Sequence, residues 1–456
     1  MLAVIGGTAA GLSAASKAKR SLPELDIHVY EKTGYSSYGS CGLPYFIGGI
    51  IREPDDLVSA KPEELRSKRG LDVFLRHEVK RIDRQNKRID ILELETGKAF
   101  TENYDYLVIA TGARSVVPDI DGVDSDGVFT LRSIEDGVRI RSVVDKGAKK
   151  AIIIGAGLIG LEVAEQLAQR GCYVELVESL PRLLPFLPLQ FAQEAADMLT
   201  ARGVGLHLGA SVRKILNKDG KACGVQLEDC QEITADFVLI AAGVAPNSSL
   251  AKDCGLNLGV RGSIVTDAAM RTTDPCIWAC GDCAQTVNRL TGEPVYVPLG
   301  TVANKQGRVA GASIAGEDAR FAGVVLSQIC KVFDLFIAGT GLTLEAARAA
   351  GFKAVQSAIT KGDKANYYPG SIDNKINLVF DSTNGKILGA QGIGSESVAG
   401  RMNVLVSAVT TGMTVAELND LDFVYTPSAA PVYDPLLIAA SSALKLVNVK
   451  NNMFPN

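Results

Sequence analysis

Two glycine-rich segments, each directly after a short apolar run, constrain the fold of this chain more than any other feature. The complete one spans residues 155–160, follows the apolar run 151–154 and opens a helix predicted to end near Arg170. A predicted strand over 173–177 then ends at an acidic residue. In a βαβ unit such glycines let the backbone approach a pyrophosphate, and the acidic residue binds ribose hydroxyls. The contact residues predicted here are Gly155, Gly157, Leu158, Ile159, Gly160 and Glu178.

The chain begins with a second unit of the same order. An apolar strand over 2–5 precedes the segment 6–11, a helix runs through Arg20, and a strand over 26–30 ends at Glu31. Thr8 replaces the middle glycine of the pattern, so this segment alone could be a glycine-rich turn in an ordinary α/β sheet. Two such units in one chain instead indicate two dinucleotides, or one dinucleotide and a flavin.

Composition agrees with a multidomain α/β protein. The chain has 456 residues, 47% of them hydrophobic, and 46 glycines, which is enough for two or three cores with many tight turns. A net charge of −4 gives no basic field for nucleic acid, and no apolar run is long enough to span a membrane. Nine scattered cysteines favour a reducing compartment, so we expect a cytoplasmic protein. Cys280 and Cys283 have CxxC spacing, but no second pair completes a metal site, and none is predicted.

Cys41 lies among small and ring residues in the segment 37–45, soon after the first βαβ unit. Ligands in open parallel sheets bind at the carboxyl ends of the strands, and we expect Cys41 on the loop or first helical turn there. The positive end of a helix lowers a thiol pKa, which would favour the reactive thiolate. The alternative is a small buried thiol without chemistry. Its place between two nucleotide segments favours the reactive interpretation.

Three other features predict the domain boundaries, a cofactor contact and the preferred nicotinamide dinucleotide. Strands over 104–112 and 237–243 are each expected to close a domain, and a separate α+β domain begins near Gly323. Asp282 follows a strand and either accepts a hydrogen bond from a cofactor hydroxyl or forms a turn. Because Glu178 would repel a 2′-phosphate, NADH is favoured over NADPH, although Arg182 could soften this preference.

Taken together, these segments resemble the pyridine nucleotide-disulfide oxidoreductases over essentially the whole chain. The resemblance implies two Rossmann-like domains and a carboxyl-terminal α+β domain: 1–115 with 245–325 for FAD, 116–244 for NAD(P), and 326–456 for dimerisation. It also implies a homodimer. For NAD it adds Gly243 to the residues given above. For FAD it implies contacts from Gly6, Gly7, Ala10, Gly11, Glu31, Lys32, Ser40, Val79, Thr111, Gly112, Gly281, Asp282 and Ala303.

The family's well-known disulfide reductases use a CxxxxC pair and a carboxyl-terminal histidine, and this chain has neither. Its single cysteine is similar to the branch of NADH peroxidases, NADH oxidases and coenzyme A-disulfide reductases. The first two typically carry a histidine where this chain has Ala9, so the third group is the best match. In that group tyrosines of the partner subunit reach the cysteine, which implies roles for Tyr367 and Tyr425, with Tyr368 as a weaker choice; the alternative is an interface function.

The same group implies a coenzyme A site. Its residues would be Ser13, Lys17, Arg20, Ser37, Arg69 and Asn304, although charges on exposed helices often only solvate the protein. We therefore expect an FAD-dependent NAD(P)H oxidoreductase that reduces coenzyme A disulfide through Cys41, with coenzyme A as substrate or adduct. The alternatives are reduction of polysulfide or persulfide, and reduction of oxygen or peroxide through a sulfenic acid. A binding or signalling flavoprotein that does not need Cys41 is a third.

Overall fold

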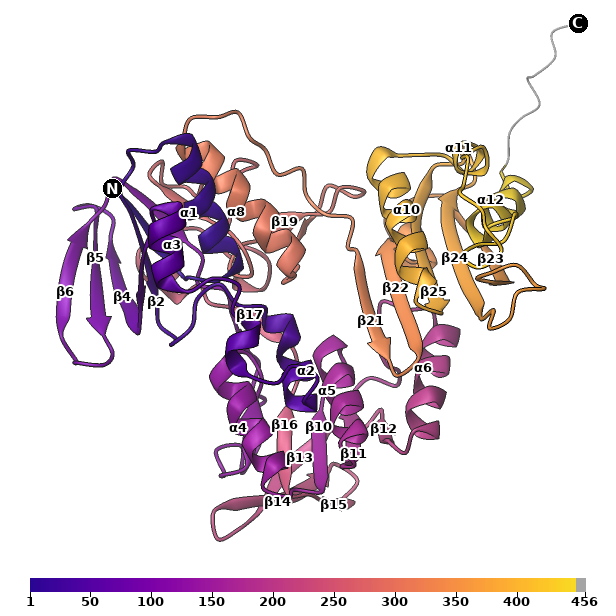
Figure 1. Cartoon of the computed structure of the whole chain (residues 1–456), viewed down its shortest axis with the longest axis horizontal. Coiled ribbons are helices and arrows are strands. Elements are labelled where there is room, and N and C mark those ends of the chain that lie inside the picture. Colours follow the sequence, from indigo (N-terminus) through magenta and orange to yellow (C-terminus); the bar gives the residue numbers. More distant parts are fainter. Residues whose placement is uncertain (448–456) are drawn as a thin grey trace, which may run out of the picture.

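The computed structural model describes residues 1–447, which form three parts (Figure 1). The first is built on a parallel sheet of order β18-β7-β1-β2-β3. Its central strand β1 is completely buried because it has neighbours on both sides and helices on its faces. The strands are β1 (Leu2–Ile5), β2 (Ile27–Glu31), β3 (Asp72–Leu75), β7 (Tyr106–Ile109) and β18 (Ile277–Ala279).

Helices α1 (Ala9–Ser21) and α8 (Gly300–Ile314) pack along each other on this sheet (Figure 1). Glycines permit this close approach: a Cβ at Gly307 would lie 2.3 Å from the Ala10 carbonyl oxygen, and one at Gly311 equally close to that of Ala14. An antiparallel sheet of β4 (His77–Asp83), β5 (Arg88–Glu93) and β6 (Ala99–Asn103) flanks the first part, and α3 (Pro62–Arg69) and α7 (Ser249–Asp253) complete it.

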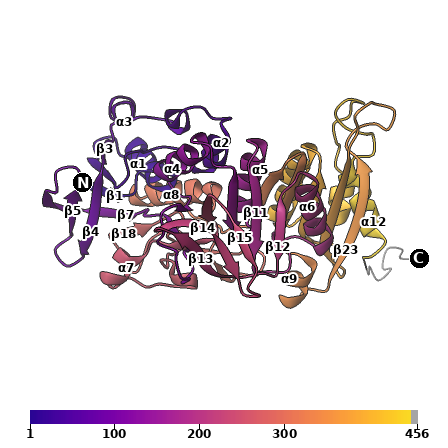
Figure 2. The same cartoon turned by 90° about the horizontal axis from the view of Figure 1, so that it is seen from below.

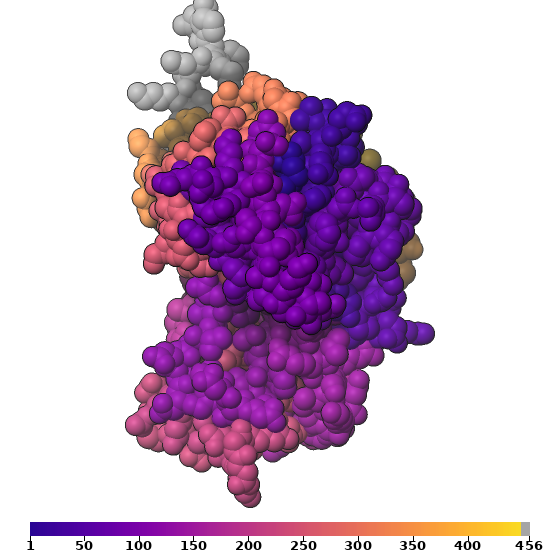
Figure 3. Space-filling view, turned by 90° about the vertical axis from the view of Figure 1, so that its left-hand side faces the viewer, coloured from indigo at the N-terminus to yellow at the C-terminus, as the bar shows by residue number. Residues whose placement is uncertain are grey.

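The second part forms a separate lobe in Figures 1 and 3. Its parallel sheet has the order β12-β11-β10-β16-β9. The strands are β9 (Val128–Thr130), β10 (Lys150–Ile154), β11 (Tyr173–Glu178), β12 (Gly205–Leu208) and β16 (Phe237–Ile240). Its helices and a second antiparallel sheet are α4 (Ile134–Asp145), α5 (Leu158–Gln169), α6 (Leu189–Ala201), β13 (Val212–Lys218), β14 (Lys221–Leu227) and β15 (Glu232–Thr234).

The carboxyl-terminal part is an antiparallel sheet of order β21-β22-β25-β24-β23, which lies at the opposite end of the molecule from β4–β6 (Figure 2). Strand β23 includes Lys361 and Gly362, and a bend follows it at Asp363. The elements are β21 (Gln328–Val332), β22 (Leu335–Gly341), α9 (Leu344–Ala349), β23 (Ala354–Gly362), β24 (Asp373–Asp381), β25 (Ile387–Gly394), α10 (Ser397–Thr411), α11 (Val415–Asn419) and α12 (Pro435–Leu444).

Short elements connect the parts. The pair β8 (Ala113–Ser115) and β17 (Val244–Pro246) joins the first two, and β19 (Thr286–Val287) pairs with β20 (Pro294–Val295). Helix α2 (Leu43–Gly48) belongs to the amino-terminal segment but packs against α4 and α5. The predicted α/β architecture is confirmed, and the last nine residues of the predicted third domain lie outside the described range. Within residues 1–447 no helix is both long and apolar enough to cross a membrane.

Candidate functional site

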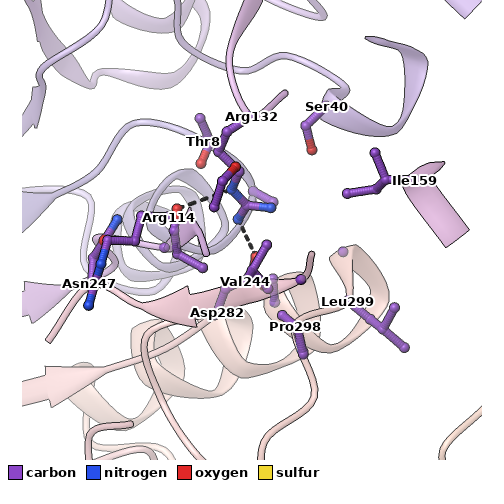
Figure 4. Close-up of a pocket in the computed structure, with 18 of the residues that line it drawn as sticks. Thr8, Ser40, Arg114, Arg132, Ile159, Val244, Asn247, Asp282, Pro298 and Leu299 are labelled. Atoms are coloured by element: carbon purple, nitrogen blue, oxygen red, sulfur yellow. Dashed lines mark hydrogen bonds and ion pairs between the residues drawn. The ribbon is translucent and has the colours of Figure 1, made fainter. Parts of the chain in front are cut away.

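A cavity of about 1440 Å³ lies where the three parts meet. Thr8 and Cys41 line it from the first part, Ile159 and Glu162 from helix α5, and Gln391 from β25. Figure 4 shows Ser40 and Ile159 to one side of Arg132 and Asp282, with a dashed line marking the pair between the last two. This cavity is larger than a typical pocket for one drug-sized ligand, so it has room for two dinucleotides.

The first glycine loop (residues 6–11) is shaped for a phosphate group. Gly6 has φ +109°, and a Cβ there would lie 2.2 Å from the Ala110 carbonyl oxygen. Helix α1 begins without any side-chain cap, so its first N–H groups remain available to an anion. One Glu31 oxygen accepts from Gly7 N at 2.7 Å and the other from Thr33 N at 2.9 Å, which fixes the carboxylate beside the loop.

The second glycine loop (residues 155–160) repeats this construction. Gly155 also has φ +109°, and a Cβ at Gly160 would lie 2.0 Å from the Gly155 carbonyl oxygen. Gly157 has open space where a side chain would project, as a loop that receives a ligand requires. Glu178 accepts from Ala156 N and Leu180 N, both at 2.8 Å. The replacement of a glycine by Thr8 therefore leaves the two loops with the same backbone design.

Cys41 lies in a single 3-10 turn, Ser40–Gly42, immediately before α2. It is an exposed residue that lines the cavity, so its thiol is accessible to a ligand. The prediction that its pKa is lowered was wrong: desolvation raises it first, and the Glu162 carboxylate raises it further. Arg132 and the Ser40 side chain oppose these effects. Helix α2, whose positive end the prediction relied on, has only six residues.

Glu162 was missed by sequence reasoning. It lies in the second turn of α5 and lines the same cavity. Burial and the neighbouring Glu165 raise its pKa to about 7. Glu165 is itself buried and accepts from Lys331 Nζ at 2.8 Å and Phe333 N at 2.9 Å, which ties α5 to the carboxyl-terminal domain. A carboxyl group that titrates near neutral pH suits proton transfer.

Arg132 was also missed. Its guanidinium donates to an oxygen of Asp282 and to the Ala113 carbonyl oxygen at 3.1 Å. Asp282 thus faces the cavity as predicted, but within the described residues its partner is an arginine and not a turn amide. Tyr296 lines the same wall, and its buried hydroxyl has no hydrogen-bond partner among residues 1–447. This side of the cavity has polar groups ready for a hydroxylated ligand.

The two predicted tyrosines lie together, away from this cavity. Tyr367 and Tyr425 have their hydroxyl oxygens 2.9 Å apart, although they come from different loops. Their exposed fractions are 75% and 46%. Neither lines the cavity of its own chain, and Tyr368 does not either. Tyr367 and Tyr425 therefore form a pair on the outside of the carboxyl-terminal domain.

The predicted substrate residues gather on and beside α1. Ser13 Oγ donates to Asn304 Oδ1 at 2.7 Å, which links α1 to α8. Lys17 is paired with Glu317 at 2.7 Å, and Arg69 contacts Ser16 Oγ at 3.5 Å. None of Ser13, Lys17, Arg20, Ser37, Arg69 and Asn304 lines the large cavity.

Among the predicted cofactor residues, two groups can be distinguished. Those that line the cavity are Gly6, Ala10, Glu31, Lys32, Ser40, Val79, Thr111, Gly112, Gly157, Leu158, Ile159, Gly243, Gly281, Asp282 and Ala303. Those that do not are Gly7, Gly11, Gly155, Gly160 and Glu178. Gly11 and Gly160 instead allow close packing within their loops, because a Cβ at either position would clash with a carbonyl oxygen of the same loop.

Comparison with known proteins identifies the family. The family model for pyridine nucleotide-disulphide oxidoreductases matches residues 1–307. The chain belongs to this family. The dimerisation domain of pyridine nucleotide-disulphide oxidoreductases matches residues 327–435, which is the carboxyl-terminal part described above. The chain is thus a member of a flavin-dependent oxidoreductase family that uses FAD and NAD(P)H, and it carries a dimerisation domain.

Relatives of this oxidoreductase have more than one activity in their names. An NADH oxidase of Methanocaldococcus jannaschii is 37% identical over 98% of this chain and 99% of its own. A CoA-dependent NAD(P)H sulfur oxidoreductase of Pyrococcus furiosus is 36% identical over 96% and 97%. The structure of reduced Bacillus anthracis CoADR-RHD has a TM-score of 0.95 and 34% identity, and the match covers 98% of this chain and 80% of that one.

Proposed function

We propose that this oxidoreductase reduces coenzyme A disulfide with electrons from NAD(P)H, through Cys41 as its one redox-active cysteine. The observation that carries the proposal is the position of Cys41: an accessible thiol on the wall of a cavity that both glycine loops also line. The Pyrococcus relative is named as CoA-dependent, which supports coenzyme A as the thiol.

The first glycine loop, with Glu31 and the wall formed by Asp282 and Ala303, would hold FAD. The second loop, with Glu178 and Gly243, would hold the nicotinamide dinucleotide, and the carboxylate of Glu178 favours NADH. When bound, FAD accepts a hydride from NAD(P)H and delivers two electrons to an acceptor beside it. The uncapped first turn of α1 and the open space at Gly157 support these assignments.

The role of Cys41 follows from thiol–disulfide exchange. Its thiolate attacks one sulfur of coenzyme A disulfide, the S–S bond breaks, and one coenzyme A leaves as a thiolate that takes a proton. Cys41 and the other coenzyme A then share a mixed disulfide. Two electrons, supplied by one NAD(P)H, break that bond and restore the Cys41 thiolate. One NAD(P)H and one proton thus convert one disulfide into two thiols.

Tyr367 and Tyr425 are proposed to act on the cysteine of a second copy of the chain. Both hydroxyls are exposed on the dimerisation domain and neither lines the cavity of its own chain. A phenol at the partner's cavity would donate a hydrogen bond to a sulfur anion, a function for which this chain has no histidine in its second half. The proposed enzyme is therefore a homodimer with shared sites.

Reduction of persulfide or polysulfide is the second candidate, favoured by the sulfur oxidoreductase named among the relatives. It uses the same thiol and differs in the leaving group. The relative named NADH oxidase supports reduction of oxygen as a third candidate, in which Cys41 would react through a sulfenic acid.

The test replaces Cys41 by serine. C41S should retain flavin absorbance and lose NADH-dependent turnover of coenzyme A disulfide, while Cys223→Ser should behave as wild type because Cys223 is also exposed and free but lies on β14. Assaying coenzyme A disulfide, polysulfide, peroxide and oxygen in parallel separates the candidates. Mass spectrometry of untreated protein should find a coenzyme A adduct on Cys41. Full turnover by C41S would reject the mechanism.

A further inference from the structure

The loop between strands β23 and β24 carries Tyr367, and a buried carboxylate closes this loop at its base. Asp363 follows β23 directly and is 4% exposed. Its backbone N–H donates to the Ile372 carbonyl oxygen at 2.9 Å, and its Oδ1 accepts from Ile372 N, also at 2.9 Å. Two hydrogen bonds therefore join the first and last residues of this segment, the Tyr367 loop (residues 363–372).

The other carboxylate oxygen of Asp363 attaches the loop to the body of the domain. Oδ2 accepts from Ser395 Oγ at 2.8 Å, and Ser395 N in turn donates to the buried Asn374 Oδ1 at 2.9 Å. Burial raises the pKa of Asp363, but hydrogen bonds from Ile372 N and Ser395 Oγ outweigh this effect, so the pKa lies below its ordinary value. The side chain is thus an ionised acceptor with a partner on each oxygen.

The tyrosine hydroxyl on this loop depends on the base of the loop for its position. Tyr367 is 75% exposed, so packing within its own chain holds little of its ring. A backbone hydrogen bond from Ala365 N to the Pro427 carbonyl oxygen, 3.3 Å long, joins the Tyr367 loop to the segment that carries Tyr425. The two hydroxyl oxygens lie 2.9 Å apart. Release of the loop at Asp363 would therefore disturb both tyrosines.

We propose that Asp363 is a positioning residue for the proposed reaction: it closes the Tyr367 loop and so holds the Tyr367 hydroxyl where it acts on Cys41 of a second copy of the chain. The inference rests on the proposed function, in which this tyrosine pair donates a hydrogen bond to a sulfur anion. Asp363 is buried and does not line the large cavity of its own chain, so its effect on the reaction would be carried by the loop.

The test measures kcat and KM for coenzyme A disulfide in the purified holoenzyme. Asp363→Ala should lower kcat about a hundredfold with little change in KM, because displacing a catalytic group by about 1 Å can cost that much. Asp363→Asn, which can still accept from Ile372 N, should recover most of the loss. Ser395→Ala removes only the contact to Oδ2 and is the milder variant, with an expected loss of about tenfold in kcat.

Asp381→Ala is the matched control. Asp381 is also buried, accepts from Thr383 N at 2.8 Å and lies at the opposite end of β24 from the Tyr367 loop. The control variant should keep the wild-type kcat although it, too, loses a buried carboxylate that closes a turn. Reduction of the bound flavin by NADH, followed by flavin absorbance, needs no tyrosine and should proceed at the wild-type rate in all of these variants.

Two further measurements separate positioning from a general loss of structure. Asp363→Ala added to Tyr367→Phe with Tyr425→Phe should be no slower than the tyrosine double variant, because Asp363 acts through those hydroxyls. Co-expressed Cys41→Ser and Asp363→Ala chains should form mixed dimers that regain turnover. In such a dimer one site combines the intact cysteine of one copy with the intact tyrosine pair of the other.

The outcomes distinguish the inference from the proposed function. With the tyrosine double variant impaired, the inference would be overturned by a wild-type kcat in Asp363→Ala, an equal loss in Asp381→Ala, slowed flavin reduction in Asp363→Ala, a further loss in the triple variant, or mixed dimers as slow as either parent. A tyrosine double variant as fast as wild type, or a wild type that does not reduce coenzyme A disulfide, would instead reject the proposed function.

Discussion

Replacing Arg401 by methionine should destabilise the dimerisation domain and loosen the loop that carries Tyr367. Arg401 lies on α10 with 8% of its side chain exposed, and its partner Asp434 is 6% exposed. The guanidinium donates to Asp434 Oδ2 from Nε at 3.0 Å and from Nη2 at 2.8 Å. Nη2 also donates to the Asp363 carbonyl oxygen at 3.2 Å, at the base of the Tyr367 loop. Asp434 in turn caps α12 through Leu436 N.

The magnitude follows from what the substitution leaves behind. Arg401→Met keeps the volume of the side chain but leaves the Asp434 carboxylate buried without a counter-ion, which costs about 3–5 kcal/mol. An exposed pair is worth about 0–1 kcal/mol, so Arg320→Gln, which breaks the fully surface pair with Asp318, is the matched control. Arg401→Met combined with Asp434→Asn removes both charges and keeps an oxygen for the helix cap. This double variant should recover about half of the loss or more.

Urea unfolding at a fixed protein concentration measures these differences from the midpoints. The Tyr367 loop is followed separately by amide hydrogen exchange over 363–372, which should speed up in Arg401→Met and stay as in wild type for Arg320→Gln. A loss below about 1 kcal/mol in Arg401→Met would refute the reasoning, because the pair would then behave like a surface contact. So would a double variant no more stable than the single one.

Three further predictions concern the cofactor loops and the cavity. Glu178→Ala with Ser179→Arg should move the preference from NADH toward NADPH, read as the ratio of the two kcat/KM values, because a repelling carboxylate gives way to a cation beside the ribose. Glu162→Gln should raise the free energy of unfolding by up to about 3 kcal/mol at pH 8 and leave it unchanged near pH 4.5. The folded protein holds the Glu162 proton up to about pH 7, so the stability of the wild type falls as the pH rises through that range. Urea unfolding midpoints at both pH values check this. Gly11→Ala should lose bound flavin and destabilise by about 1–3 kcal/mol, since its Cβ would lie 1.9 Å from the Gly6 carbonyl oxygen, whereas Gly400→Ala, with open space around it, should keep full flavin absorbance per chain.

The parts of the fold that sequence could predict are those fixed by neighbours in the chain. Strands β1 and β10 are apolar runs, as strands buried on both faces require. Each is followed at once by a glycine with a positive φ, which the turn into the loop requires. The two acidic residues that end β2 and β11 lie beside their loops as expected. Local pattern is sufficient here because the whole βαβ unit is contiguous.

The residues that sequence could not predict depend on contacts between distant segments. Arg132 and Glu162 reach the cavity from α4's leading segment and from α5, and neither belongs to a motif that would mark it. The pKa of Cys41 was mispredicted for this reason: the helix end is visible in sequence, but the desolvation and the Glu162 carboxylate that raise the pKa are not.

The environment of Cys41 within its own chain favours the protonated thiol over the thiolate that the proposed chemistry requires. Exchange requires a thiolate, yet desolvation, Glu162 and Asp282 all favour the protonated thiol, and only Arg132 and Ser40 act in the other direction. Arg132 is also paired with Asp282, whose negative charge opposes the effect of the guanidinium on the sulfur. The hydrogen bond from Ser40 and the charge of Arg132 do not outweigh the effects that favour the protonated thiol. The exposed Tyr367–Tyr425 pair has two hydroxyl groups and does not line the large cavity of its own chain. In the proposed dimer, the pair of one copy would donate a further hydrogen bond to the cysteine of the other and so favour its thiolate.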